Sequence, residues 1–435
     1  MSVTAIIAEY NPMHKGHEYL IDRARQITGA DYVLVVMSGD FVQRGAPAVM
    51  NKYMRTETAL LGGADLVIEL PAYYSLASAE YFAKGAVSLI DSLNVADSIC
   101  FGVECDDMKL LYELAEIPVF YKEEYDSYVS KFTSEGASFA KADAMAICEI
   151  IGNMDDESDN YALSYSIDEL EQILSSPNNT LAISYIKALV SLDSPIKAYG
   201  VKRLNSEYHD ESLGALSSSA VRKELIDGNF APLKDQLSDE IYDYLSTYLD
   251  TTYPINIDDY SDILVYKLMD IIYGSGNNIK ASGILKLTEF LDVSESLAAR
   301  IINCLNDFES FSQFTALLKT KDTTYSRISR ALMHIVLNIK KSNFNKYIAN
   351  NYSLYARILG FNESSSGILS LLKQNSTIPV ISKLADAEKN IGDELTMKLL
   401  NENTYTAEIY GHIASNKFKT DFIPEYSRPI VLQRI

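Results

Sequence analysis

Two histidines, His14 and His17, flank Gly16 directly after the first apolar run of the chain, which has only five histidines. A helix that begins at this point offers unpaired N–H groups and a positive dipole end, and both favour a phosphate group. Imidazoles at positions i and i+3 stand on one side of the first turn, where they can donate hydrogen bonds to a phosphate as its charge rises. The pattern predicts a phosphate-binding loop, with His14 and His17 as the catalytic residues.

A metal site is the alternative interpretation of this histidine pair. A catalytic metal ion needs a third protein ligand, and the remaining histidines lie far away in sequence, at positions 209, 334 and 412. We therefore predict no metal site built from protein side chains.

A second segment with phosphate-binding chemistry is ALSSSAVR, at positions 215–222. Ser218 and Ser219 offer hydroxyl groups at a predicted helix start, and Arg222 follows within one turn. Taken alone, the segment fits an ordinary serine N-cap and a surface arginine better. Combined with the histidine motif, it resembles the late serine- and arginine-containing element of the HxGH nucleotidyltransferase superfamily.

Strand and helix patterns alternate through the first half of the chain. Buried strands are predicted at 3–8, 32–37, 66–70, 98–101 and 196–201, and helices at 17–27, 52–61, 78–90 and after 217–219. Such alternation is typical of a parallel sheet covered on both faces, whose ligands bind beyond the carboxyl ends of the strands. Residues 11–17 lie at that edge.

After about residue 228 the apolar residues follow helical periods. The sequence therefore predicts a Rossmann-like α/β domain over residues 1–228, with a helical insertion at about 105–175. The resemblance to the HxGH superfamily implies that this domain is a nucleotidyltransferase. An all-α domain is predicted over residues 229–435. The length of 435 residues fits two domains, and 47% hydrophobic with 22% charged residues is typical of a soluble globular protein.

Composition also bears on the compartment. No apolar run approaches the roughly 18 residues of a membrane span, and no secretion signal is recognisable. The four cysteines are scattered and form no CxxC pair, which indicates reduced thiols. We expect a cytoplasmic protein without a membrane partner.

The net charge of −21 argues weakly against a nucleic-acid partner. The segment 319–346 departs from this average, because it holds seven cations and one acid. A solvated helix face is the alternative to a phosphate-binding surface. The candidate RNA contacts are Lys319, Lys321, Arg327, Arg330 and Lys340.

A closer resemblance rests on motifs that occur in a fixed order. They are EYNPMHKGH at 9–17, VMSGDFVQRG at 36–45, ELP at 69–71, CFG at 100–102, SPNN at 176–179, KR at 202–203 and YHD at 208–210. Together they resemble the bacterial tRNA(Met) cytidine acetate ligase family. The resemblance covers residues 3–225 and is more diffuse in the helical half.

This resemblance implies a two-step reaction. Acetate would attack the α-phosphate of ATP to give acetyl-adenylate, and the acetyl group would pass to N4 of the wobble cytidine of elongator tRNA(Met). Mg²⁺ is expected with the ATP. The partners would be acetate and this tRNA, and the sequence does not determine the oligomeric state.

The resemblance also implies an ATP site that includes the first motif. With the second serine-containing segment, the predicted ATP-binding residues are Ile7, Ala8, Glu9, Tyr10, Asn11, Pro12, Met13, His14, Lys15, Gly16, His17, Leu20, Gly102, Asn178, Arg203, Ser218, Ser219 and Arg222. Asn179 is the alternative to Asn178, and Lys15 would add a cation near the phosphates. Lys52 and Arg55 share a helix face that would meet the triphosphate, the tRNA or solvent.

Two other functions stay open at this point. One is an adenylyltransferase that acts on a small phosphorylated metabolite, although such a substrate would not need the helical half with its basic segment. The other is a non-catalytic RNA-binding protein on this fold, in which loss of a phosphate clamp would be expected.

Overall fold

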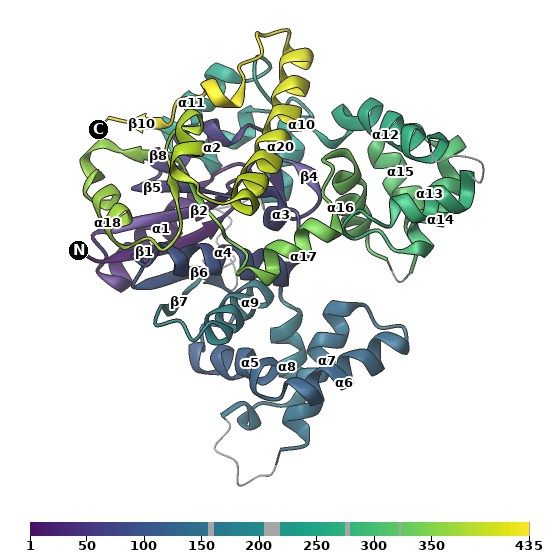
Figure 1. The fold of residues 1–435 in the computed structure, drawn as a ribbon. Helices are drawn as coiled ribbons and strands as arrows, with labels where there is room; N and C mark the ends of the chain where they lie inside the picture. Colours follow the sequence, from purple (N-terminus) through teal and green to yellow (C-terminus); the bar gives the residue numbers. More distant parts are fainter. Residues whose placement is uncertain (155–160, 204–217, 275–278, 322, 435) are drawn as a thin grey trace.

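A computed structural model describes residues 1–154, 161–203, 218–274, 279–321 and 323–434 (Figure 1). Eight of its described strands form one sheet in the order β10-β8-β5-β2-β1-β6-β7, with β9 beside β8. The strands are β1 (Val3–Ala8), β2 (Tyr32–Ser38), β5 (Leu66–Leu70), β6 (Ser98–Val103), β7 (Lys197–Lys202), β8 (Ala356–Asn362), β9 (Val380–Ile381) and β10 (Val431–Gln433). The predicted first-half strands are confirmed.

The five strands that the first half contributes to this sheet are all parallel. From the central β1 the chain builds β2 and β5 on one side and β6 and β7 on the other. This reversal of strand order creates a crevice outside the carboxyl ends of the strands, which is where open α/β sheets bind ligands. The loop after β1 lies at this edge of the sheet.

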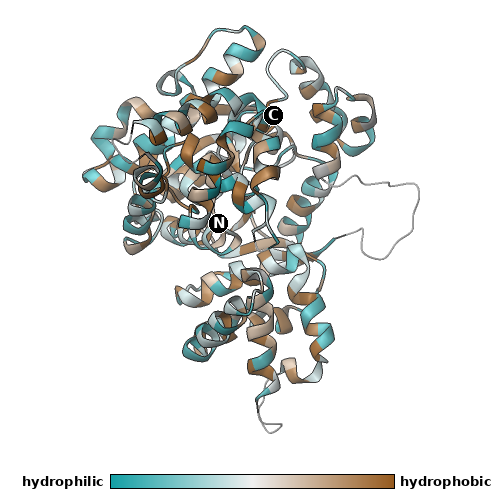
Figure 2. Ribbon diagram, turned by 90° about the vertical axis from the view of Figure 1, so that its right-hand side faces the viewer, coloured by the Kyte–Doolittle hydropathy of each residue, from teal (hydrophilic) through white to brown (hydrophobic). Residues whose placement is uncertain are grey.

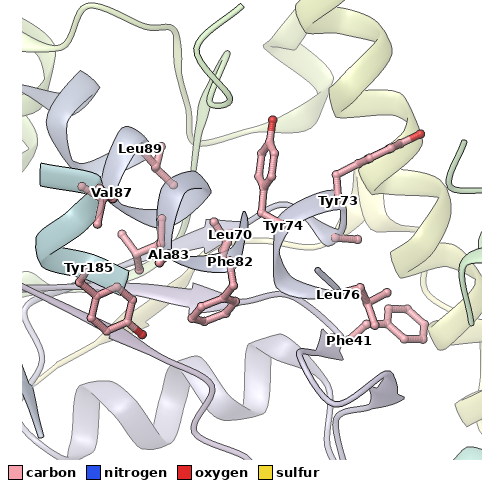
Figure 3. Packing of buried hydrophobic residues seen from close by; sticks show 14 of the residues in the cluster. Phe41, Leu70, Tyr73, Tyr74, Leu76, Phe82, Ala83, Val87, Leu89 and Tyr185 are labelled. Carbon is pink, nitrogen blue, oxygen red and sulfur yellow. The ribbon is translucent and has the colours of Figure 1, made fainter. Parts of the chain in front are cut away.

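Helices cover both faces of the sheet because side chains alternate along each strand. Val33 and Val35 of β2 belong to the apolar cluster that includes α1 (Lys15–Thr28), α2 (Lys52–Leu61) and α10 (Ser218–Ile226). Leu34 and Val36 belong to the opposite cluster, with α4 (Ala79–Leu93) and α9 (Pro177–Ser191). Figure 3 shows part of this second cluster, in which Tyr185 of α9 lies near Phe82 and Ala83 of α4.

Helices fill the region of the predicted insertion at about 105–175. It comprises α5 (Met108–Phe120), α6 (Lys122–Ser134), α7 (Phe139–Gly152), a short 3-10 turn (Tyr161–Ser164) and α8 (Ile167–Ser175). These helices form the lobe below the sheet in Figure 1. A second group lies to the right of the sheet in that view and includes α12 (Ser261–Tyr273), α13 (Ile279–Leu287), α14 (Glu295–Cys304), α15 (Phe311–Leu318) and α16 (Tyr325–Val336).

The helical character of the C-terminal region is confirmed, but the expectation that it holds no strands is wrong. Strand β8 pairs with β5 in antiparallel orientation, and β10 pairs with β8 in parallel. The apolar run in β8 is short, and a run of that length does not distinguish a strand from a buried helix. The division at residue 228 stays a prediction, and the sheet itself extends beyond it.

The remaining described α-helices lie in both halves of the chain. They include α3 (Ala72–Ser75), α11 (Asp239–Tyr248), α17 (Lys341–Ala349), α18 (Gly367–Asn375), α19 (Ala387–Asn390) and α20 (Glu394–Phe418). Figure 2 shows hydrophilic residues interspersed with hydrophobic ones along the outer helices. Among the helices that the structure describes, none has both the length and the apolar character to cross a membrane.

Candidate nucleotide-binding site

The loop after β1 is fixed from two sides at Asn11. Its side-chain Oδ1 accepts a hydrogen bond from the Val49 main-chain N at 2.8 Å. Its main-chain oxygen accepts one from Nη1 of Arg222 at 2.9 Å. Arg222 comes from α10, so the structure brings the two predicted phosphate-binding segments together at the carboxyl edge of the sheet.

His14 and His17 build the N-terminus of α1. His14 is the N-cap residue, and its Nδ1 accepts a hydrogen bond from the Gly16 main-chain N at 3.1 Å. The Nδ1 of His17 accepts one from the main-chain N of His14 at 3.2 Å. The two rings stack with centroids 3.8 Å apart. Because Nδ1 is an acceptor in both rings, each neutral imidazole carries its proton on Nε2.

The surroundings keep both imidazoles neutral. Burial lowers the pKa of His14 to about 4, and the charges of Arg203 and Arg222 add to this effect. Burial, with His14 and Arg203 nearby, holds the pKa of His17 well below its usual range. Both rings are therefore preorganised neutral donors, which is the form that stabilises developing charge on a phosphate without a proton transfer.

Three predicted residues meet at the ends of β6 and β7. Nη1 of Arg203 donates a hydrogen bond of 3.0 Å to Oδ1 of Asn178. A Cβ atom at Gly102 would lie 3.6 Å from Cγ of Arg203, so this main chain lies against the arginine stem. The structure thus gathers Gly102, Asn178 and Arg203 at one point on the carboxyl edge.

Asn179 has a different role from that of Asn178. Its side chain is buried, and its Oδ1 accepts hydrogen bonds from the main-chain N of Glu104 at 2.9 Å and of Cys105 at 3.0 Å. Asn179 therefore holds the turn after β6. Sequence reasoning missed Glu104, whose carboxylate accepts hydrogen bonds from the Asn179 main-chain N at 2.9 Å and from the Asn178 side chain. Its position directly after a predicted strand was the available signal.

Several other predicted residues line or support the loop. Tyr10 is buried, with its ring centroid 5.0 Å from that of His17, and Met13 is fully buried. Lys15 extends to the main-chain oxygen of Asp235, at 2.9 Å. Ile7, Ala8 and Leu20 lie at the end of β1 and in α1, and the peptide bond before Pro12 is cis.

Part of the second segment lies outside the described residues. Ser218 and Ser219 begin α10, but their side chains are not among those described. The same holds for Ser217 and for the motif at 208–210. Their contribution to the site stays a prediction.

The expectation that Lys52 and Arg55 face a ligand or solvent is wrong, because both side chains are fully buried. Nζ of Lys52 lies 2.7 Å from a carboxylate oxygen of Glu69, 2.5 Å from Glu425 and 3.8 Å from Asp40. Burial raises the pKa of Asp40 to about 6, against the opposing charge of Lys52. The carboxylates that neutralise Lys52 come from three distant segments, so no local pattern revealed them.

The basic segment at 319–346 is only partly available to a partner. Lys319, Lys321 and Arg327 are exposed. Nε of Arg330 lies 3.1 Å from Asp292, and Nζ of Lys340 lies 3.1 Å from Glu289 and 3.5 Å from the centroid of the Phe290 ring. Acidic residues from outside the segment therefore neutralise two of the five predicted cations.

Helix α16, which carries Arg327, lies against a small hairpin at the carboxyl edge. The hairpin joins β3 (Phe41–Val42) to β4 (Ala46–Pro47). Oγ of Ser329 donates a hydrogen bond of 2.7 Å to the Gly45 main-chain oxygen. On the same hairpin, the Gln43 main-chain N donates one of 2.8 Å to the Glu9 carboxylate. The hairpin thus connects the basic helix to the first motif.

Comparisons with known proteins agree with this geometry. The model of the HIGH nucleotidyl transferase family matches residues 1–421. The tRNA(Met) cytidine acetate ligase of Clostridium perfringens (strain SM101 / Type A) is 38% identical over 406 residues, covering 92% of this chain and 94% of that protein. The protein of the same name from Clostridium kluyveri (strain ATCC 8527) is 37% identical over 439 residues, covering 100% of both chains.

The fold agrees with a solved structure as well. The crystal structure of Thermotoga maritima TmcAL bound with alpha-thio ATP superposes with a TM-score of 0.88, at 25% identity and with 100% of each chain covered. An apo form of the same protein gives the same TM-score. The chain therefore belongs to the HIGH nucleotidyl transferase family, and within it to the tRNA(Met) cytidine acetate ligases.

Proposed function

We propose that this protein is an ATP-dependent ligase that acetylates N4 of the wobble cytidine of elongator tRNA(Met). The observation that carries the proposal is the pair of stacked, neutral imidazoles at the start of α1, with Arg203 and Arg222 beside them. We infer the acceptor of the acetyl group from the relatives, because the C. perfringens and C. kluyveri proteins are called tRNA(Met) cytidine acetate ligases. The work of such an enzyme would place it in the cytoplasm.

In the first step, an acetate oxygen attacks the α-phosphorus of ATP and the bond to the β-phosphate breaks. The products are acetyl-adenylate and pyrophosphate. Charge accumulates on the leaving pyrophosphate, and the Nε2–H groups of His14 and His17 are suited to stabilise it. Arg203 and Arg222 contribute fixed positive charge, and Gly102 with Asn178 would border the nucleoside.

Mg²⁺ would enter this site with the triphosphate. Among the described residues, no group of three or more histidine, cysteine, aspartate or glutamate side chains is arranged to hold a metal ion. A Mg²⁺ ion that is bound with ATP would be held mainly by phosphate oxygens and water, as is common for nucleotide-bound magnesium.

In the second step, N4 of the cytidine attacks the acetyl carbonyl, AMP leaves, and the nitrogen loses a proton. The wobble base lies in a single-stranded loop, so its edge is reachable without opening a helix. The exposed cations Lys319, Lys321 and Arg327 would contact tRNA phosphates, since such contacts position a nucleic acid. Arg330 and Lys340 would contribute less to tRNA binding, because each already forms an ion pair with an acidic residue of the protein.

The test uses purified protein, ATP, radiolabelled acetate and an unmodified elongator tRNA(Met) transcript. We expect label in N4-acetylcytidine that depends on ATP and is lost in His17→Ala. His412→Ala, which changes an exposed histidine on α20, serves as the matched control and should keep activity. Adenylyl transfer to a small phosphate ester, with no label in RNA, would instead establish the metabolite adenylyltransferase. A protein that binds the RNA but turns over no ATP would be the non-catalytic alternative.

A further inference from the structure

We propose that Arg55 is a positioning residue of the nucleotide site, which fixes the loop after β1 to the carboxyl end of β2. This role of Arg55 rests on the proposed function in one respect, namely that the loop after β1 binds ATP. Arg55 lies in the first turn of α2, and its side chain has no exposed surface.

The guanidinium group of Arg55 binds main-chain oxygens from three segments. Its Nη1 donates to both Glu9, at 2.7 Å, and Ser38, at 3.0 Å. Nη2 donates to Gly39, and Nε donates to Met50 at 3.1 Å. A single nitrogen atom therefore joins the first residue after β1 to the last residue of β2.

The chemistry of these contacts requires arginine. A guanidinium presents five N–H donors in a rigid plane, whereas an ammonium group presents three donors at one point and could not span these carbonyl groups. None of the ion pairs among the described residues includes Arg55. Burial lowers its pKa, and a buried charge without a paired carboxylate is costly. Its four main-chain acceptors offset this cost, and so do the nearby carboxylates of Asp40, Glu9 and Glu69, which form no ion pair with it.

The main chain that Arg55 binds at Glu9 is the start of the loop that carries His14 and His17. Glu9 precedes His14 by five positions, and its carboxylate is also fixed by the Gln43 main-chain N at 2.8 Å. Because the N-cap geometry of His14 sets the direction of both imidazoles, a shift of the Glu9 carbonyl would move the catalytic pair. Displacement of about 1 Å can cost on the order of 100-fold in rate.

Lys52 provides an internal contrast. It lies on the same helix, three positions earlier, and is equally buried, but its ammonium contacts the carboxylates of Glu69 and Glu425. Arg357 of β8 joins the same cluster, 2.7 Å from Glu425. Lys52 therefore joins α2 to β5 and to the C-terminal segment. These contacts fix the position of the helix that carries Arg55.

The experiment compares Arg55→Lys and Arg55→Met with Leu359→Ala. Leu359 is a fully buried residue of β8, on the far side of β5 from β2, and its apolar side chain makes none of the hydrogen bonds that hold the loop. The measurements are the melting temperature, the Kd for ATP by calorimetry, and the pKa of His14 by NMR of the imidazole protons. None of these needs acetate or tRNA.

We expect both Arg55 variants to weaken ATP binding by about 10-fold or more, because the loop loses its support. Leu359→Ala should lower the melting temperature by a similar amount and leave the Kd for ATP unchanged. In Arg55→Lys, the milder variant, the pKa of His14 should rise towards its ordinary value as the loop opens to water. An ATP affinity and a His14 pKa that change no more in Arg55→Lys than in Leu359→Ala would overturn the proposal.

These outcomes are independent of the identity of the acceptor. If the wild-type protein binds ATP but acetylates no tRNA, the proposed function fails while the role of Arg55 is still measured. If acetylation is confirmed and Arg55→Lys binds ATP like Leu359→Ala, only the positioning role fails.

Discussion

Arg222 and Asn11 are 211 positions apart in the chain, yet Nη1 of Arg222 donates a 2.9 Å hydrogen bond to the main-chain oxygen of Asn11. This contact seats α10 against the histidine loop. A positive charge that the sequence places in the late serine segment therefore stands beside His14, where it also lowers the pKa of that imidazole. The two phosphate-binding elements form one site.

Arg222→Lys should separate the geometry of this contact from its charge. Lysine keeps the cation but lacks the planar donor set, so we expect the loop to be held less firmly and kcat/KM for ATP to fall by about 10-fold. Arg222→Met should lose on the order of 100-fold, since the charge is also gone. Acetate-dependent exchange of pyrophosphate into ATP measures both. Equal losses in the two variants would show that only the charge matters.

The lowered pKa of His14 predicts a pH dependence of stability. In the folded protein the His14 imidazole takes up a proton only as the pH falls to about 4, because its pKa is lowered to that value. In the unfolded chain it takes up the proton as the pH falls below the ordinary pKa of 6.5. The unfolded state therefore holds more protons between these values, and the contribution of His14 to stability is lost as the pH falls from about 6.5 to 4. Thermal unfolding at pH 7 and pH 5 should show a smaller decrease for His14→Gln than for the wild type. Identical decreases would contradict this assignment.

Gly45 should be intolerant of a side chain. It has a φ of +81°, and an added Cβ would lie 2.4 Å from the main-chain N of Arg330. Gly45→Ala should therefore push the hairpin away from α16 and reduce acetylation of tRNA more than binding of ATP. Gly29→Ala is the matched control, because Gly29 also has a positive φ, of +64°, with no atom within 4 Å of an added Cβ. If both variants behave alike, backbone strain alone explains the effect.

The Lys52 cluster should be a major source of stability. Lys52→Met would leave the Glu69 and Glu425 carboxylates buried without their closest cation, and breaking such a pair costs about 3–5 kcal/mol. Lys84→Met, which breaks a half-buried i,i+4 pair with Glu80 (2.8 Å), should cost about 0.5 kcal/mol or less. Urea unfolding monitored by circular dichroism gives both values. A loss below about 1 kcal/mol for Lys52→Met would show that the carboxylates take up protons instead.

Arg327 and Arg330 should differ although they are one turn apart. Arg327 is exposed, so Arg327→Ala should weaken tRNA binding and reduce the salt dependence of that binding by about one phosphate contact. Arg330 is paired with Asp292 at 3.1 Å, so Arg330→Ala should reduce stability more than affinity. Filter binding of the tRNA(Met) transcript over a salt series separates the two. Equal salt slopes for Arg327→Ala and the wild type would exclude a phosphate contact.

Much of the fold was predictable because its signals are local. Buried strands such as 66–70 are short apolar runs between turn residues, and the helix at 52–61 was predicted with the bounds that the structure shows. The loop chemistry was predictable for the same reason, since the spacing of His14 and His17 around Gly16 depends only on neighbouring residues. Strand β8 was missed because pairing with β5, not its own pattern, makes it a strand.

The sequence by itself determined the parallel sheet of the first half, the phosphate-binding character of the first motif and the family to which the motifs point. The tertiary structure alone decided which charged side chains are free to contact ATP or tRNA. It buried Lys52 and Arg55, paired Arg330 with Asp292, and set Asn178 rather than Asn179 beside Arg203. The physical reason is that burial and ion pairing depend on distances between residues far apart in the chain, and those distances exist only once the chain has folded.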